Sequence, residues 1–330
     1  MNVALGRRAL IGQFRPLDAL AVIVNNRTLR AAAARPVQTF ANSTSKFELN
    51  ETMEPLISVA WLQENLTRPD LIILEAGLPS AVSAGAVPPP EDEGIPGSIY
   101  VDLNKYFADE DQVLPHMLAT PYKFSEDAQA LGVNQDHTIV VFDKFGIYAS
   151  PRLRLAFKAM GHDKVAVLNG GLPAWRATGP TNAPSQVGSR RQPGNFVANF
   201  RPRVFCDAES VCEAMQSADH AIVDARSSGR FKGTAPEPRA GLRGGHIPSA
   251  VNMPFDSVLD QGVMRSADEL QTIFDSHSLA SKRLIFSCGS GVTACVPALA
   301  AEVIGVTDIK VYDGSWSEWG ARHDLPVTTD

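Results

Sequence analysis

Short apolar runs alternate with amphipathic stretches along most of the chain. Such runs are typical of buried strands, whereas apolar residues spaced three and four apart predict helices. We predict strands at 71–75, 138–142, 165–168, 221–224, 283–286 and 310–312. We predict helices at 58–66, 125–131, 150–160, 207–216, 266–274 and 293–304. Strands that alternate with helices form parallel sheets covered on both faces, so we expect an α/β fold.

The two halves of the chain resemble each other. The segment IVVFDKFGIYASPRL at 139–153 matches LIFSCGSGVTACVPAL at 284–299. Three further segments, at 73–80, 95–103 and 169–175, recur in the same order at 222–229, 247–255 and 313–319. The repeat predicts two tandem domains of one fold, each a parallel sheet with helices on both faces.

The domains are bounded by stretches of different composition. We place the first domain at 55–177 and the second at 206–330, joined by a linker at 178–205 that is rich in Pro, Gly and polar residues. Residues 1–46 are rich in Arg and Ala and contain a single acid, Asp18, which is typical of an organellar transit peptide. A tail without function is the alternative. We expect a mitochondrial location, with plastid and cytoplasm as alternatives.

Composition excludes several classes of function. The 330 residues carry a net charge of −6 without a basic stripe, so we expect no nucleic-acid partner. No apolar run is long enough to span a membrane, so we expect no membrane partner. The four cysteines form no C-x-x-C pair and have no histidines at zinc spacing, so we expect no metal and no cofactor. Sparse cysteine use also suits a reducing compartment.

The loop after the predicted strand at 283–286 carries the candidate chemistry. It begins with Cys288, contains two glycines, and leads into a helix that we expect Thr293 to cap. Glycines allow a loop to curl its amides inward, and amides at a helix N-terminus bind anions. A cysteine there would have a stabilised thiolate, which predicts a nucleophile. A buried strand-end cysteine before an ordinary glycine turn is the alternative. The first copy has Asp143 at this position, so only the second domain should be catalytic.

The tandem repeat, the CGSGVT loop and the closing YDGSWSEW resemble the rhodanese superfamily, and within it the 3-mercaptopyruvate sulfurtransferases. The resemblance implies two rhodanese-like domains and a sulfur transfer through Cys288. The Cys288 thiolate would attack the sulfur of 3-mercaptopyruvate, form a persulfide and release pyruvate. A thiol acceptor, such as reduced thioredoxin, would then take the sulfur.

The resemblance also implies substrate-binding residues. Arg230 and Arg239, in GRFKGTAPEPR, match the residues that hold the substrate carboxylate and carbonyl in this superfamily. A guanidinium suits a planar carboxylate because it donates two parallel hydrogen bonds. The loop amides would hold the persulfide anion, and they belong to Gly289, Ser290, Gly291, Val292 and Thr293.

A proton relay is implied as well. Ser290 matches the family's loop serine, and His116 matches a histidine supplied by the first domain. The family's third member is an aspartate, but the matching position here is Asn104, with Asp102 two residues earlier. Either residue could complete the relay.

Three other functions compete with this interpretation. Thiosulfate:cyanide sulfurtransferases resemble the chain, but they carry cationic side chains where Gly289 and Ser290 stand. A non-catalytic sulfur-carrier or interaction module is a second alternative. Cysteine phosphatases need an arginine six residues after the cysteine, and Ala294 occupies that position, which argues against them.

Overall fold

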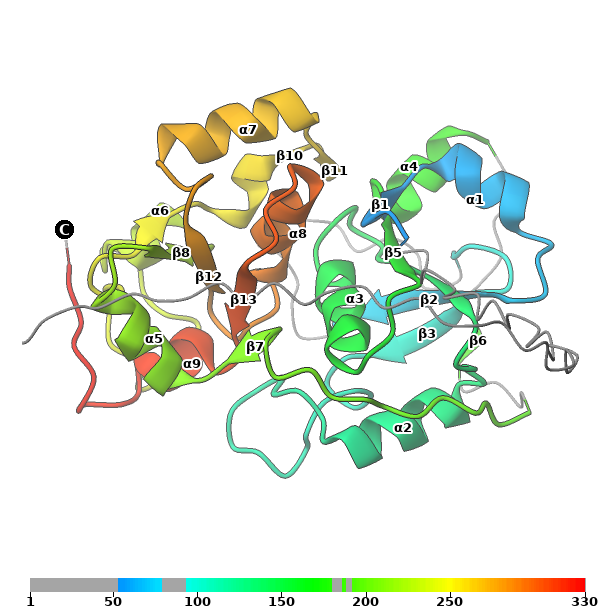
Figure 1. The fold of residues 1–330 in the computed structure, drawn as a ribbon, viewed down its shortest axis with the longest axis horizontal. Helices are drawn as coiled ribbons and strands as arrows, with labels where there is room; N and C mark the ends of the chain where they lie inside the picture. The colour runs from blue at the N-terminus through cyan, green and yellow to red at the C-terminus, as the bar shows by residue number, and fades with distance from the viewer. Residues whose placement is uncertain (1–52, 79–92, 180–185, 188–191, 330) are drawn as a thin grey trace, which may run out of the picture. The chain divides into compact units, whose positions relative to one another are not determined.

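Two parallel sheets form the framework of the chain (Figure 1). The computed structural model describes residues 53–78, 93–179, 186–187 and 192–329. Within these residues the first sheet contains, in spatial order, β1 (Leu56–Ile57), β5 (Val165–Leu168), β4 (Thr138–Phe142), β2 (Leu71–Gly77), β3 (Ile99–Asp102) and β6 (Gln186–Val187). The second contains β7 (Phe205–Cys206), β13 (Ile309–Tyr312), β12 (Arg283–Ser287), β8 (His220–Asp224) and β9 (Val251–Asn252). All strand pairs in both sheets are parallel, so the predicted α/β class is confirmed.

Helices cover both faces of each sheet. The first domain contains α1 (Val59–Asn65), α2 (Pro121–Ala130), α3 (Ser150–Ala159) and α4 (Gly171–Ala177). The second contains α5 (Ala208–Met215), α6 (Ser228–Phe231), the 3₁₀ turn η1 (Phe255–Val258), the hairpin strands β10 (Leu259–Asp260) and β11 (Val263–Met264), α7 (Ala267–Ser276), α8 (Cys295–Val303) and α9 (Ser315–Trp319). Successive strand residues point to opposite faces. Ile285 therefore packs in one core cluster with residues of α5 and α9, and Phe286 packs in another with residues of α7 and α8.

Capping residues decide where several helices begin. Ser58 caps α1, and Ser266 forms a capping box with Glu269 at the start of α7. Helix α2 begins at Pro121 after a Thr120 cap, four residues before the predicted start at 125. The expected Thr293 cap is wrong, because α8 begins at Cys295 and has no side-chain cap.

The described part of the predicted linker packs against the first domain. Phe196 is fully buried, with its ring against Phe124 and Phe157. The Asn199 amide donates to the Met160 carbonyl at 2.9 Å. The predicted transit peptide at 1–46 lies outside the described residues. Within the described residues, no helix is both long and apolar enough to cross a bilayer.

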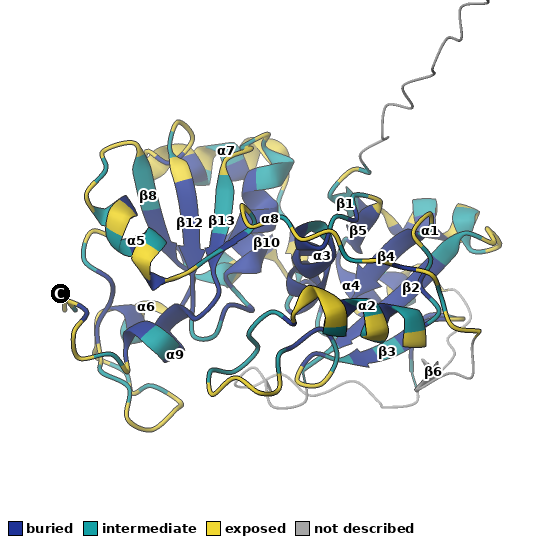
Figure 2. Ribbon diagram, turned by 60° about the horizontal axis from the view of Figure 1, so that its bottom comes forward, coloured by how far each residue is buried: buried dark blue, intermediate teal, exposed yellow. Residues whose placement is uncertain are grey.

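Helices α3 and α8 join the two domains. Nearly every residue of α3 is buried, as its dark colour in Figure 2 shows. Arg154 of α3 binds both carboxylate oxygens of Glu302 in α8, at 3.0 and 2.9 Å, and Lys158 adds a third contact to Glu302 at 2.9 Å. One hydrophobic cluster includes residues of both helices. The two domains therefore share a core.

Replacing Gly171 with alanine should destabilise the first domain. Gly171 has φ +53°, and a Cβ there would lie 2.4 Å from the carbonyl oxygens of Asp143 and Gly146. Gly179→Ala is the matched control, because Gly179 has φ +71° but open space around it. We expect the control to cost about 1 kcal/mol from backbone strain and Gly171→Ala to cost about 1–3 kcal/mol more from overpacking. Urea unfolding measures both, and equal losses would contradict the prediction.

Candidate active site

Strand β12 delivers Cys288 to the carboxyl edge of the second sheet. Cys288 is buried, and its backbone is held by the segment that begins α9. The Cys288 amide donates to Ser315 Oγ at 3.2 Å, and its carbonyl accepts from the Trp316 amide at 3.0 Å. The Gly289 carbonyl accepts from both the amide and the hydroxyl of Ser317, at 2.9 and 2.6 Å. These contacts use the Cys288 amide and the carbonyls of Cys288 and Gly289, but not the amides that follow Cys288.

The amides that follow Cys288 have no acceptor in the described part of the chain. None of the N–H groups of residues 289–294 donates a hydrogen bond to a described residue. Buried N–H groups are almost always paired in folded proteins. A run of unpaired amides beside a cysteine is therefore suited to an anion, such as a thiolate or persulfide.

The first domain shows the same loop with an anion in place. The Asp143 carboxylate accepts from the amides of Phe145, Tyr148, Ala149 and Ser150 at 2.8 to 3.1 Å. It also accepts from the Ser150 hydroxyl at 2.8 Å. By the repeat, these four amides correspond to those of residues 290, 293, 294 and 295 in the second domain. The geometry of the repeat thus supports an anion site around Cys288.

The other cysteines are poor nucleophiles. Burial raises the pKa of Cys295 to about 12 and that of Cys206 to about 12. Burial also raises the pKa of Cys212. Cys295 packs in the core and contacts the Gly291 carbonyl at 3.3 Å, as expected for a structural residue.

Arg230 lies beside the cysteine loop. A Cβ on Gly289 would be 3.0 Å from Arg230 Nη2, so the guanidinium packs against the glycine. Glu237 fixes Arg230 through contacts of 2.6 and 3.2 Å. Glu237 also binds the buried Arg226 at 2.9 Å, and Arg226 in turn pairs with Asp224 at 2.6 Å. This cluster of two arginines and two carboxylates has no net charge.

Arg239 differs from Arg230 because it is exposed. It makes no hydrogen bond or ion pair with any described residue. Its positive charge nevertheless acts on His116, where it lowers the pKa of the imidazole. Arg239 and His116 therefore lie within electrostatic reach of each other.

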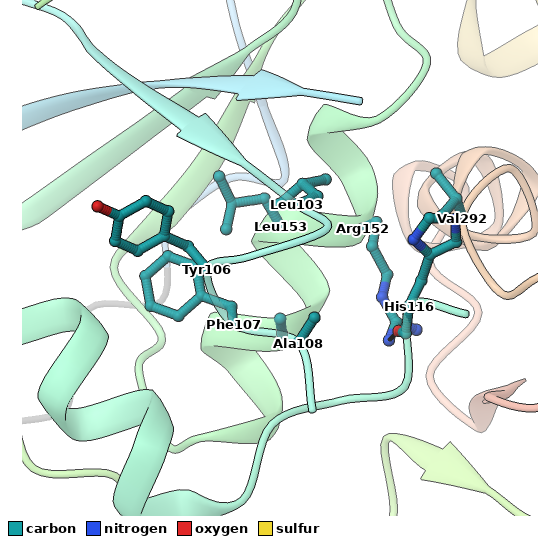
Figure 3. Close-up of a pocket in the computed structure, with 9 residues that line it drawn as sticks. Leu103, Tyr106, Phe107, Ala108, His116, Arg152, Leu153 and Val292 are labelled. Carbon is teal, nitrogen blue, oxygen red and sulfur yellow. Dashed lines mark hydrogen bonds between the residues drawn. The ribbon is translucent and has the colours of Figure 1, made fainter. Parts of the chain in front are cut away.

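His116 comes from the first domain and lies next to the loop of the second. Figure 3 shows His116 beside Val292, and both line a cavity of about 10 Å³ with Arg152. Burial, followed by the charges of Arg152 and Arg239, lowers the pKa of His116 to about 4, and the carboxylates Asp313 and Asp102 oppose this shift only in part. His116 is neutral at physiological pH, and its Nδ1 atom is buried without a partner among the described residues.

The predicted relay is not hydrogen-bonded in this structure. No hydrogen bond joins Ser290 to His116 within the described residues. Asp102 accepts from the Asn104 amide at 2.9 Å, so it caps its own turn. Asp313, which follows β13, influences His116 more strongly than Asp102 does. Sequence reasoning did not identify Asp313.

Tyr148 is a second residue that sequence reasoning missed. Its ring meets Phe255 of the second domain edge-on at 5.5 Å. Burial raises the pKa of Tyr148, and the neighbouring charge of Cys288 raises it further. The repeat could have indicated it, because Tyr148 occupies the position of Thr293 in the first loop.

Comparison with known proteins agrees with the fold. The rhodanese-like domain family matches residues 58–178 and 207–322. The chain is 37% identical over 322 residues to thiosulfate/3-mercaptopyruvate sulfurtransferase 1, mitochondrial, of Arabidopsis thaliana, covering 90% of this chain and 84% of the relative. It is also 37% identical over 280 residues to thiosulfate sulfurtransferase of Rattus norvegicus, covering 81% of this chain and 92% of the relative.

A solved structure shows the same architecture. The crystal structure of a 3-mercaptopyruvate sulfotransferase from Escherichia coli aligns with a TM-score of 0.71 and 32% identity, over 81% of this chain and 100% of that one. The chain belongs to the rhodanese family, and its relatives make it a sulfurtransferase of the thiosulfate/3-mercaptopyruvate type.

The His116 imidazole should titrate near pH 4. NMR of its ring protons, assigned with a His116→Gln variant, measures the midpoint. Because an unfolded histidine titrates near 6.5, the unfolded state binds the proton first as the pH falls. The His116 contribution should therefore lower the free energy of unfolding between about pH 6.5 and 4. A midpoint at or above 6.5 would contradict the burial and charge argument.

Proposed function

We propose that the chain is a 3-mercaptopyruvate sulfurtransferase. The observation that carries the proposal is the charge balance around Cys288. Arg230 is neutralised by Glu237, and Arg152 by Asp313, whereas Arg239, whose charge acts on His116, has no partner among the described residues. One such cation matches the single carboxylate of 3-mercaptopyruvate. Thiosulfate carries two charges, and its leaving group, sulfite, is also an anion.

The reaction begins with the Cys288 thiolate. Its sulfur attacks the thiol sulfur of 3-mercaptopyruvate, and the bond between that sulfur and carbon breaks. The bonding electrons pass to carbon as the enolate of pyruvate, which takes up the proton of the substrate thiol to give pyruvate. The new persulfide on Cys288 is an anion that the amides of Gly289, Gly291 and Val292 can stabilise.

The substrate is held from outside the loop. Arg230 and Arg239 would bind its carboxylate and carbonyl, since a guanidinium donates two aligned hydrogen bonds. Ser290 and neutral His116 would handle the proton, and the amide of Thr293 would complete the anion site. A thiolate of an acceptor such as reduced thioredoxin then attacks the outer persulfide sulfur. The acceptor leaves with that sulfur, and the Cys288 thiolate is restored.

The rest of the chain supports this chemistry. We propose that 206–330 is the catalytic domain and that 55–177 is a domain without a catalytic cysteine, joined by the linker 178–205. Asp143 occupies the anion site of the first domain, which leaves no room there for a sulfur anion. For residues 1–46 we propose import into mitochondria, in line with the mitochondrial relative.

Cys288→Ser should abolish sulfur transfer. Forming an alkoxide at residue 288 needs a much stronger base than forming a thiolate does. Mass spectrometry of the wild type after donor addition should show one added sulfur on the peptide that contains Cys288. Cys212→Ser, which alters a cysteine outside the site, is the control and should remain active. Turnover by Cys288→Ser would refute the assignment.

The wild type should prefer 3-mercaptopyruvate to thiosulfate. Pyruvate release and thiocyanate formation measure kcat/KM for the two donors. Arg239→Lys should raise KM for 3-mercaptopyruvate by roughly tenfold, because an ammonium cannot replace the guanidinium fork. Arg283→Lys is the control, since Arg283 is exposed and pairs with Asp308 at the other end of β12. A higher kcat/KM for thiosulfate in the wild type would replace this proposal with the thiosulfate one.

A further inference from the structure

One arginine of the first domain contacts three segments around the site. Arg152, on α3, is 5% exposed and lies 2.6 Å from Asp313 Oδ1. Its Nη2 donates to the His116 carbonyl at 2.6 Å, and its Nη1 donates to the Gly291 carbonyl at 3.4 Å. Figure 3 shows its side chain extending from α3 to His116 and Val292. The guanidinium therefore links the histidine segment, the cysteine loop and the end of β13.

The two carbonyls that Arg152 binds belong to residues with positive φ, which is unusual for His116. His116 has φ +63° and Gly291 has φ +74°. A non-glycine residue in the left-handed region is strained, and such a conformation persists only where surrounding contacts hold it. Arg152 provides such contacts on both sides of the site at once.

We propose that Arg152 is a positioning residue of the sulfurtransferase reaction, which fixes His116 relative to the Cys288 loop by binding the backbone of both. The inference rests on the proposed function. It gives the first domain a specific role, because the cysteine loop of the second domain depends on an arginine from α3. A positional error of about 1 Å can lower a rate about 100-fold, so fixing two segments together matters for turnover.

After burial, the charge of Arg152 is the next largest cause of the lowered pKa of His116. The charged groups that act on the imidazole are Arg152, Arg239, Asp313 and Asp102. Asp313 and Asp102 raise the pKa of His116, and Arg152 lowers it. Removing the Arg152 cation should therefore raise this pKa above its value of about 4. A lysine at 152 keeps the charge but cannot reach three acceptors.

Arg154 offers a matched control on the same helix. It is equally buried, at 3% exposed, and it also pairs across the domains with a carboxylate, Glu302. It makes no contact with the cysteine loop or with His116. Arg154→Met should therefore weaken the domain interface without affecting the reaction.

The experiment compares Arg152→Lys, Arg152→Met and Arg154→Met with the wild type. We expect Arg152→Lys to lower kcat about 10- to 100-fold, with a smaller change in KM. Arg152→Met should also move the His116 titration to higher pH. Arg154→Met should lower the melting temperature and leave kcat and the titration unchanged. If Arg152→Met does not fold, because the buried Asp313 loses its cation and keeps only the Leu118 amide at 2.9 Å, Arg152→Lys still tests the positioning role.

Two outcomes would overturn the inference. One is a kcat of Arg152→Lys equal to that of the wild type. The other is a loss of kcat in Arg154→Met as large as the loss in Arg152→Lys when the two variants have the same melting temperature. Failure of the proposed function is distinguishable, because the wild type would then show the higher kcat/KM for thiosulfate. In that case the same kcat comparison is made with thiosulfate as donor, and the His116 titration needs no substrate.

Discussion

A loop whose amides lack acceptors of their own is the constraint around which the site is built. The amides of residues 289–294 find no partner in the described part of the chain. A donor that is buried without a partner costs about 1–3 kcal/mol, so an anion or water that accepts from these amides stabilises the loop. In the proposed reaction a sulfur anion on Cys288 does so, and the substrate sulfur joins the same environment when the persulfide forms.

The first domain meets the same constraint with a different residue. The Asp143 carboxyl group accepts from four amides of its loop, so that loop needs no ligand. That loop leads directly into α3. Tyr148 lies just before the helix, and Arg152 lies in its N-terminal half. Both residues reach the second domain, through Phe255 and through Asp313. The first domain, which has Asp143 in place of the cysteine, therefore has a structural role beside the cysteine loop of the second domain.

Much of this arrangement could be predicted from the sequence, and the reasons are local. The central strands were predicted within about two residues because buried strands are continuous apolar runs, and Cys288 was found because glycines mark its loop. Edge strands such as β7 and β9, two residues each, carry too short a pattern to detect. Arg152 and Asp313 were missed because a charged residue in a helix or at a strand end is normally solvated. Their pairing joins segments that only the tertiary structure brings together.

The paired charges around the loop have a consequence for the reaction itself. Because Arg152, Arg226 and Arg230 each have a carboxylate partner, the fixed charges near Cys288 largely cancel. A neutral His116 adds no charge either, so it can exchange a proton without first losing one to the surroundings. In the proposed reaction, charge that develops on the sulfur and on the enolate is then met by oriented dipoles and by Arg239, and such preorganised groups need not rearrange during the reaction.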